Sequence, residues 1–162
     1  MKNEIVFGID PGFDRLGWSV AQFVNNKCNL LSYGLITTNK KDTLCQRYLD
    51  LANQFEVLVQ EFKPTQAALE SLFFQNNQKT AIAVAQARGI ILSALLRSGA
   101  TCYEYTPPQI KLAVAGHGKA DKKSVEKMVR AQIALPDEKI IDDTIDSLAV
   151  LLTHFANRKN NV

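Results

Sequence analysis

Apolar and polar residues alternate along the first quarter of the chain in a pattern that predicts three consecutive strands. An apolar run over residues 5–9 has the length of a buried central strand, and an Asp-Pro-Gly sequence at 10–12 ends it. Apolar and polar positions then alternate over 16–24, and a third strand is expected at 30–37 after a polar turn. Because the links between these strands are short, they should form an antiparallel meander.

The pattern changes to a helical period after this meander. Apolar residues recur with a 3.6-residue rhythm from about 44 to 62, which predicts a helix that Thr43 can cap and that Pro64 prevents from continuing. Short strands are expected at 66–70 and 101–105. Together with the meander, these elements predict an α/β domain with a five-stranded mixed sheet, an antiparallel meander plus parallel strands, flanked by helices.

A long helix is predicted from about 80 to 97, with apolar residues nearly all round it. A helix packed on a sheet needs one apolar stripe, so the second face should meet another protein surface, of which a second copy of the same helix is the simplest. The alternative is a fully buried central helix. Further helices are expected at 109–114, at 124–134 and from 142 onward, with a glycine-containing basic loop over 115–123.

Length and composition fit a single domain. Of the 162 residues 46% are hydrophobic, which is enough for one core over 1–157 followed by a polar tail at 158–162. No run approaches the ~20 apolar residues of a membrane span and no leader pattern opens the chain, so a cytoplasmic protein without a membrane partner is expected. Cys28, Cys45 and Cys102 are odd in number and lack C-x-x-C spacing, so we interpret them as reduced residues. The net charge of +3 permits a polyanionic partner without requiring one.

Acidic side chains stand at the ends of two predicted strands and at the start of the last helix. Asp10 ends the first strand and Glu70 ends the fourth. Asp143 and Asp146 share a helix face because they are three residues apart. If the two strands are neighbours and the helix packs beside them, all four carboxylates meet at one edge of the sheet. Carboxylates so close repel one another by several kcal/mol, so the cluster needs cations.

The ligand type favours a hard divalent cation. Carboxylate oxygens and water suit Mg²⁺ or Mn²⁺, and the lack of His and Cys near these positions disfavours zinc. Two Mg²⁺ ions roughly 4 Å apart can clamp a phosphodiester and activate the attacking water, which predicts metal-dependent phosphodiester hydrolysis. Two alternatives stay open. Asp10 could cap a turn, and either Asp142 or Asp143 could only cap the last helix, because Asp142 lies four residues before Asp146 and periodicity does not separate the pair.

Lysines and aromatic residues indicate a DNA contact surface. Ammonium and backbone N–H groups in a glycine-containing loop can reach phosphates, although solvation at the surface is the common fate of lysine. At the start of a polar loop, one of Phe73 and Phe74 can stack on DNA while the other packs inward. The candidate DNA-binding residues are Phe73, Phe74, Lys79, Lys111, Lys119, Lys122 and Lys123.

Four motifs occur in a fixed order along the chain. They are Gly8-Ile9-Asp10-Pro11-Gly12, Leu69-Glu70 followed by Phe73, Gln86-Ala87-Arg88-Gly89, and Asp143-x-x-Asp146-Ser147-Leu148-Ala149. In this order and spacing they resemble the RuvC family of Holliday junction resolvases, which has the ribonuclease H fold. The resemblance covers nearly the whole chain, from Asn3 to Phe155.

The resemblance implies a Mg²⁺-dependent, structure-specific endonuclease of recombination and repair. Such enzymes are homodimers that bind four-way DNA junctions and nick two opposed strands symmetrically. Two Mg²⁺ ions per active site are expected, with Mn²⁺ as a substitute. By resemblance, the metal-binding and catalytic residues are Asp10, Glu70, Asp143 and Asp146.

Further roles follow from the same resemblance. The residue matching Phe73 stacks near the crossover, and Lys111 and Lys122 match lysines near the scissile phosphate and the DNA backbone. The long helix resembles the dimer helix of the family, and a branch-migration motor complex is an expected partner. Two other functions stay open: a nuclease of this fold acting on RNA or non-junction DNA, and a junction-binding protein without cleavage. Comparing cleavage of a junction, a plain duplex and a structured RNA separates them.

Overall fold

The helices and strands follow the chain in the predicted order. The computed structural model describes residues 4–71 and 78–158. The elements are β1 (Glu4–Asp10), β2 (Arg15–Val24), β3 (Lys27–Thr37), α1 (Leu44–Phe62), β4 (Gln66–Glu70), α2 (Gln78–Arg97), β5 (Thr101–Tyr105), α3 (Pro107–Ala115), α4 (Lys122–Gln132) and α5 (Asp142–Asn157).

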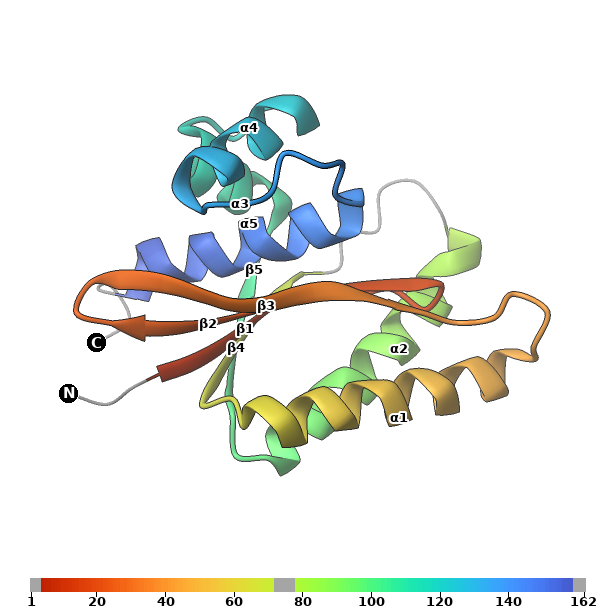
Figure 1. Ribbon diagram of the computed structural model, residues 1–162. Coiled ribbons are helices and arrows are strands. Elements are labelled where there is room, and N and C mark those ends of the chain that lie inside the picture. The colour runs from red at the N-terminus through yellow and green to blue at the C-terminus, as the bar shows by residue number, and fades with distance from the viewer. Residues whose placement is uncertain (1–3, 72–77, 159–162) are drawn as a thin grey trace.

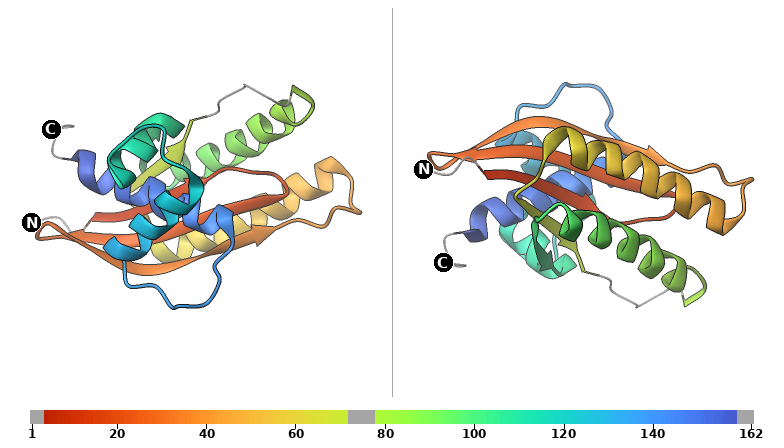
Figure 2. Two further views of the ribbon diagram at one scale, coloured as in Figure 1. Left: turned by 90° about the horizontal axis from the view of Figure 1, so that it is seen from above. Right: turned by 90° about the horizontal axis from the view of Figure 1, so that it is seen from below.

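One sheet with the strand order β3-β2-β1-β4-β5 forms the middle layer of the molecule (Figure 1). The first three strands form the predicted antiparallel meander, and β4 and β5 run parallel to β1. Helices α1 and α2 cover one face, while α5 lies on the other face with α3 and α4 packed on its outer side (Figures 1 and 2). The predicted α/β class with a five-stranded mixed sheet is confirmed.

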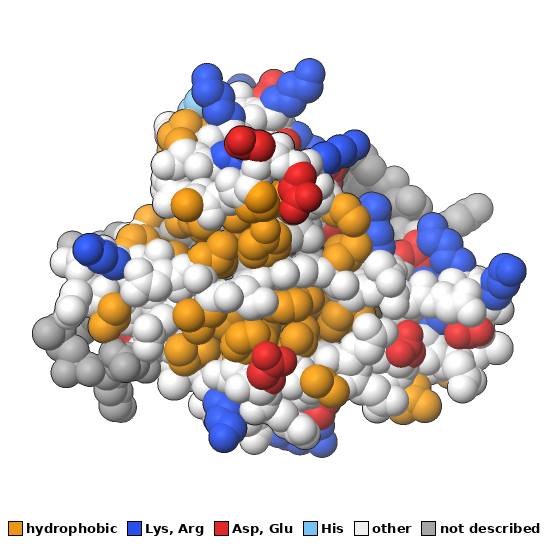
Figure 3. All heavy atoms as spheres, viewed as in Figure 1, with side chains coloured by type: hydrophobic (Ala, Val, Ile, Leu, Met, Phe, Trp, Pro, Cys, Tyr) orange, Lys and Arg blue, Asp and Glu red, His pale blue; other side chains and the backbone are white. Residues whose placement is uncertain are grey.

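Apolar side chains fill the space on both faces of the sheet. On one face, Phe7 and Leu69 pack in a core with Phe55 of α1 and Ile91 of α2. On the other face, Leu148 of α5 belongs to a second core shared with α3 and α4. Figure 3 shows apolar side chains on both sides of the β3 edge, where the two layers of helices meet the sheet. Because α5 is buried along most of its length, its acidic first turn is held in a fixed position over the sheet.

The parallel pairing of β1 and β4 determines where two of the predicted acids lie. Ile9 is the register partner of Leu69, so Asp10 and Glu70 are the next residues of the two adjacent strands. Parallel strands end at the same edge of a sheet, and both carboxylates therefore stand at that edge.

Two glycines let α5 lie directly against the sheet. A Cβ atom on Gly17 of β2 would lie 1.8 Å from the carbonyl oxygen of Asp143, and one on Gly8 of β1 would lie 2.4 Å from that of Ser147. Ser19 Oγ also donates a hydrogen bond to the Ser147 carbonyl at 3.0 Å. Any side chain at these glycines would push α5 away, so they set the distance between the helix acids and Asp10.

Helix α4 begins earlier than the sequence pattern predicted. Asp121 is its N-cap, because its Oδ1 accepts a hydrogen bond from the Ser124 N–H at 2.8 Å. Lys122 and Lys123 therefore lie in the first turn of a helix rather than in the predicted basic loop. The backbone of α4 fixes the directions in which these two side chains leave the chain.

The prediction that no run approaches the length of a membrane span is corrected at helix α2. Residues 80–97 are long and apolar enough to cross a membrane by length and composition alone. The helix nevertheless packs on the sheet, with Ala87, Ile91 and Leu95 fully buried, and its Arg88 pairs with Glu104 of β5. Packing within the fold therefore explains the apolar residues on the buried face of this helix. The alternative of a fully buried central helix is wrong, because one side of α2 is exposed.

Candidate functional site

Four carboxylates from three elements meet at one edge of the sheet. Asp10 ends β1, Glu70 ends β4, and Asp143 and Asp146 lie near the start of α5. Burial raises the pKa of Asp10 most, and the charges of Glu70, Asp146 and Asp143 each raise it further. The structure thus brings together the four acids that the sequence selected.

Burial and mutual repulsion hold the pKa values of these acids above their ordinary range. Burial, followed by the charge of Asp146, raises the pKa of Glu70 to about 7, although Lys122 and Lys111 oppose the shift. Burial also raises the pKa of Asp146, against the opposing charge of Lys122. Carboxylates that resist ionisation in this way are stabilised by a cation placed between them, so the edge is suited electrostatically to a divalent ion.

Two basic side chains compensate part of this negative charge. Lys122 Nζ lies 3.6 Å from Asp146 Oδ2, and Arg15 Nη2 lies 3.2 Å from Asp143 Oδ2. Across residues 4–71 and 78–158, no three His, Cys, Asp or Glu side chains converge closely enough to hold one ion. The donor set fits a hard cation in type and charge. Shared coordination requires Asp143 and Asp146 to turn away from their basic partners.

The structure distinguishes the positions of Asp143 and Asp142. The sequence had left open which of the two acids faces the other carboxylates. The side chain of Asp143 is 20% exposed and its charge acts on Asp10, whereas that of Asp142 is 69% exposed and pairs with Lys122 at 3.9 Å. Neither acid is the N-cap of α5, because Ile141 occupies that position. Asp143 therefore faces the cluster, and Asp142 lies on the outer side of the first turn.

The predicted DNA-binding residues fall into three groups. Lys111 and Lys122 line a cavity of about 220 Å³ together with Glu70 and Asp146, so the structure places them beside the acids. Lys119 and Lys123 are exposed on the same side of the sheet, one before α4 and one in its first turn. Phe73 and Phe74 lie outside the described residues, and Lys79 is described only as part of the first turn of α2.

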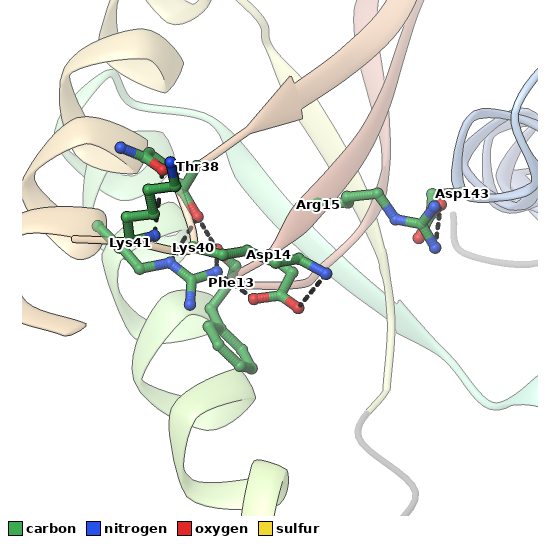
Figure 4. A network of polar contacts seen from close by, with 9 residues as sticks. Phe13, Asp14, Arg15, Thr38, Lys40, Lys41 and Asp143 are labelled. Carbon is green, nitrogen blue, oxygen red and sulfur yellow. Dashed lines mark hydrogen bonds and ion pairs between the residues drawn. The ribbon is translucent and has the colours of Figure 1, made fainter. Parts of the chain in front are cut away.

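A polar network under the β1–β2 turn was not predicted from the sequence (Figure 4). Arg47 of α1 is buried, pairs with Asp14, and donates from Nε to Thr38 Oγ1 at 2.9 Å. Its guanidinium also lies 4.8 Å from the centre of the Phe13 ring. The network holds the turn that follows Asp10. The sequence did contain a signal, because Arg47 lies four residues before Leu51 on the buried stripe of α1, and a buried arginine requires an acidic partner.

A second unpredicted network joins α5 to the strands that carry and flank Glu70. His154 Nδ1 lies 2.8 Å from the Tyr105 hydroxyl, and its Nε2 lies 2.7 Å from Gln66 Oε1. Burial lowers the pKa of His154 to about 4. The imidazole is therefore neutral near pH 7, and it ties α5 to β4 and β5.

The raised pKa of Glu70 predicts how stability depends on pH. The folded protein holds a proton on Glu70 up to about pH 7, whereas the ordinary value is 4.5. Between these values the folded state binds more protons than the unfolded state, so stability falls as pH rises. The neutral amide in Glu70→Gln removes this pH-dependent loss. In EDTA, the substitution should therefore be more stabilising at pH 8 than at pH 5, by on the order of 2 kcal/mol in the free energy of unfolding after allowance for partial exposure.

Urea unfolding of the wild type, Glu70→Gln and the exposed control Glu61→Gln at pH 5 and pH 8 tests this expectation. The control should keep the pH dependence of the wild type. An equal loss of stability with pH in Glu70→Gln would contradict the assigned pKa.

The fold and the acidic edge define the class of protein. A mixed sheet in the order β3-β2-β1-β4-β5, with carboxylates at the ends of its two central parallel strands and at the start of the covering helix, is a ribonuclease H-like nuclease domain.

Comparison with known proteins gives the family. A family model described as crossover junction endodeoxyribonuclease RuvC matches residues 6–154. The protein of that name from Petrotoga mobilis is 40% identical over 150 residues, which cover 93% of this chain and 92% of the relative. The one from Finegoldia magna is 41% identical over 154 residues, which cover 95% of this chain and 94% of the relative. This chain belongs to the RuvC family of crossover junction endodeoxyribonucleases, as its motifs predicted.

A solved structure supports the same assignment. The structure of T. thermophilus RuvC in complex with Holliday junction substrate aligns with a TM-score of 0.89 at 31% identity, covering 98% of this chain and 96% of that one. The predicted ribonuclease H-like fold and the predicted family are both confirmed.

Proposed function

We propose that this protein resolves four-way DNA junctions by hydrolysing two opposed strands, with Mg²⁺ held by Asp10, Glu70, Asp143 and Asp146. The observation that supports this most strongly is the coupling of the four carboxylates, three of which raise the pKa of the fourth, Asp10. Membership of the RuvC family supplies the substrate class. Two ions bound by these carboxylates would supply the Lewis-acid and water-activating chemistry of phosphodiester hydrolysis.

We propose that the basic side chains beside the acids bind DNA phosphates. Lys111 and Lys122 line one cavity with Glu70 and Asp146, where their ammonium groups can neutralise the phosphates of the strand being cut. We propose that Lys79, Lys119 and Lys123 add further phosphate contacts and that Phe73 or Phe74 stacks on a base. If four or five lysines contact phosphates, log affinity should fall with log salt at a slope of roughly −4.

We also propose that the protein is a homodimer joined through α2. Five residues at three- and four-residue spacing form an exposed stripe along α2, and apolar side chains stand near both ends while small or polar ones occupy the middle. A groove of about 490 Å³ runs beside the stripe, between α1 and α2. Small central residues permit close approach of a second helix. The stripe consists of Ile82, Gln86, Gly89, Ser93 and Leu96.

Two further proposals rest on family resemblance and on the substrate. A branch-migration motor is proposed as a partner from the resemblance alone. A cytoplasmic location is proposed because the DNA substrate is found there and the cysteines Cys28, Cys45 and Cys102 are free thiols in the fold.

The test is cleavage of a synthetic four-way junction, a plain duplex and a structured RNA, each with Mg²⁺ and with EDTA. We expect paired nicks in opposed strands of the junction, little cleavage of the other substrates, and no cleavage in EDTA. Equal cleavage of RNA or duplex would favour a nuclease of broader substrate range. Junction binding without nicks would contradict the enzymatic proposal.

A further inference from the structure

We propose that Arg15 binds a phosphate of the DNA strand at the acidic edge, exchanging its ion pair with Asp143 for that phosphate. This inference rests on the proposed function and adds a strand contact on the side of the site opposite Lys111 and Lys122. Four observations lead to it: the geometry of the ion pair, the exposure of Arg15, the cavity beside it, and the anchoring of the turn from which it projects.

The ion pair with Arg15 balances the charge of Asp143 but does not supply a hydrogen bond to its buried oxygen. Arg15 Nη2 lies 3.2 Å from Asp143 Oδ2 (Figure 4), yet within the described parts of the chain this buried oxygen accepts no hydrogen bond. An arginine and a carboxylate bind most strongly through two parallel hydrogen bonds, which this pair does not make. The contact is therefore weak enough to be exchanged when Asp143 turns toward a divalent ion.

Arg15 is placed to reach a ligand from solvent. Its side chain is 55% exposed, and it is the first residue of β2, opposite the end of β3. A cavity of about 450 Å³ lies beside it, lined in part by Gly12, Lys40 and Asp143. Lys40 is 78% exposed and lies 3.7 Å from Asp14, so the same cavity has a second basic side chain at its rim.

The cavity beside Arg15 reaches the acids at Asp143, whereas the cavity lined by Lys111 and Lys122 reaches them at Glu70 and Asp146. Lys111 and Lys122 belong to the cavity formed with α3 and α4, whereas the cavity of Arg15 is formed by the β1–β2 turn, α5 and the start of α2. A strand whose scissile phosphate lies at the acids has further phosphates on both sides of it. The lysines can neutralise phosphates on one side, and Arg15, which pairs with Asp143, can bind a phosphate on the other.

The turn that carries Arg15 is rigid enough to position it. Thr38 Oγ1 donates to the Phe13 carbonyl at 2.7 Å, and the buried Arg47 pairs with Asp14. The main chain before Arg15 is thus anchored to α1, and only the side chain needs to move. A planar guanidinium, which donates through a fork of N–H groups, suits a phosphate better than the point charge of a lysine.

Junction binding measured by fluorescence anisotropy tests the proposal without relying on cleavage. Ca²⁺ takes the same oxygen ligands as Mg²⁺, and electrophoresis of the samples verifies that the DNA is intact. In Ca²⁺, Arg15→Ala should weaken junction affinity about tenfold and reduce the magnitude of the salt slope by about 1. In EDTA, where Arg15 stays paired with Asp143, the loss should be under about threefold. Arg15→Lys should keep the salt slope and recover part of the affinity.

Lys27→Ala is the matched control, since it removes an exposed positive charge at the opposite end of the same sheet. It should leave both affinity and slope unchanged. If wild type binds the junction and Arg15→Ala binds it equally with an equal slope in Ca²⁺, Arg15 is only the counter-charge of Asp143 and the inference is overturned. If wild type itself binds a junction no better than a duplex, the proposed function fails, and this inference fails with it.

Discussion

Asp143→Asn should lower the rate of junction cleavage by at least about 1,000-fold, a loss of roughly 4 kcal/mol of transition-state stabilisation. The amide keeps the size of the side chain but removes the negative charge that would hold a divalent ion. The partner of Asp143 in the structure is Arg15, and the carboxylate is close enough to Asp10 to raise its pKa. The fold should tolerate the change, because Asp143 makes no hydrogen bond through its buried oxygen among the described residues.

Asp142→Asn is the matched control for this prediction. It makes the same chemical change one residue earlier in the same helical turn, but its side chain is 69% exposed, and its charge raises the pKa of Asp146 without acting on Asp10. Its cleavage rate should stay within about threefold of wild type, since an exposed ion pair such as that with Lys122 contributes little. Single-turnover cleavage of a junction with Mg²⁺ measures both variants. A large loss in Asp142→Asn with little loss in Asp143→Asn would reverse the assignment.

Gly89→Glu should convert the proposed dimer to a monomer and remove the pairing of the two nicks. A Cβ atom at Gly89 has no neighbour within 4 Å, so the fold of the single chain does not oppose the new side chain. In the dimer, two new carboxylates would approach each other where small residues allow the helices to meet. Juxtaposed like charges cost several kcal/mol, so dimer affinity should fall by at least about 100-fold.

Light scattering at micromolar concentration measures this change, and a junction labelled on two opposed strands reports whether nicks occur in pairs. Asn53→Glu, which adds the same charge at an exposed position of α1, should stay dimeric. A monomer mass for the wild-type protein, even when junction DNA is present, would contradict the dimer proposal. A dimeric Gly89→Glu would place the interface elsewhere.

Local patterns were sufficient to predict the sheet and to select the acids that the structure brings to its edge. Alternation over 16–24, a third strand at 30–37 and the short links between the strands predicted a meander, and the runs that end in Asp10 and Glu70 predicted two strand tips. These predictions succeeded because each depended on residues close in sequence. The order of the motifs then supplied the family, which periodicity alone does not define.

Features that depend on contacts between distant segments were not predicted. Asp142 and Asp143 have the same local chemistry, and only the packing of α5 on Gly8 and Gly17 turns one toward the acids and the other outward. The ion pair of Arg15 could not be predicted from the neighbouring residues, because its partner Asp143 is 128 residues away. The start of α4 was misplaced for a local reason, since Asp121 was not identified as a cap.

The networks around Arg47 and His154 show the same limit. Each buried polar side chain could be suspected from its position in a helix, but its partners come from other elements. His154 joins Tyr105 of β5 and Gln66 of β4, which only the folded sheet brings together. Both networks join elements that carry site acids to their neighbours, and they help to fix the positions of those elements.

Divalent-ion binding by the acidic edge is the claim on which the mechanism depends. Anomalous diffraction from crystals soaked in Mn²⁺ locates such ions directly. We expect anomalous peaks between the carboxylates of Asp10, Glu70, Asp143 and Asp146, with Asp143 and Asp146 turned away from Arg15 and Lys122, and no such peaks in crystals of Asp10→Asn. Saturating Mn²⁺ that leaves these carboxylates paired as they are now, with no ion among them, would contradict the account.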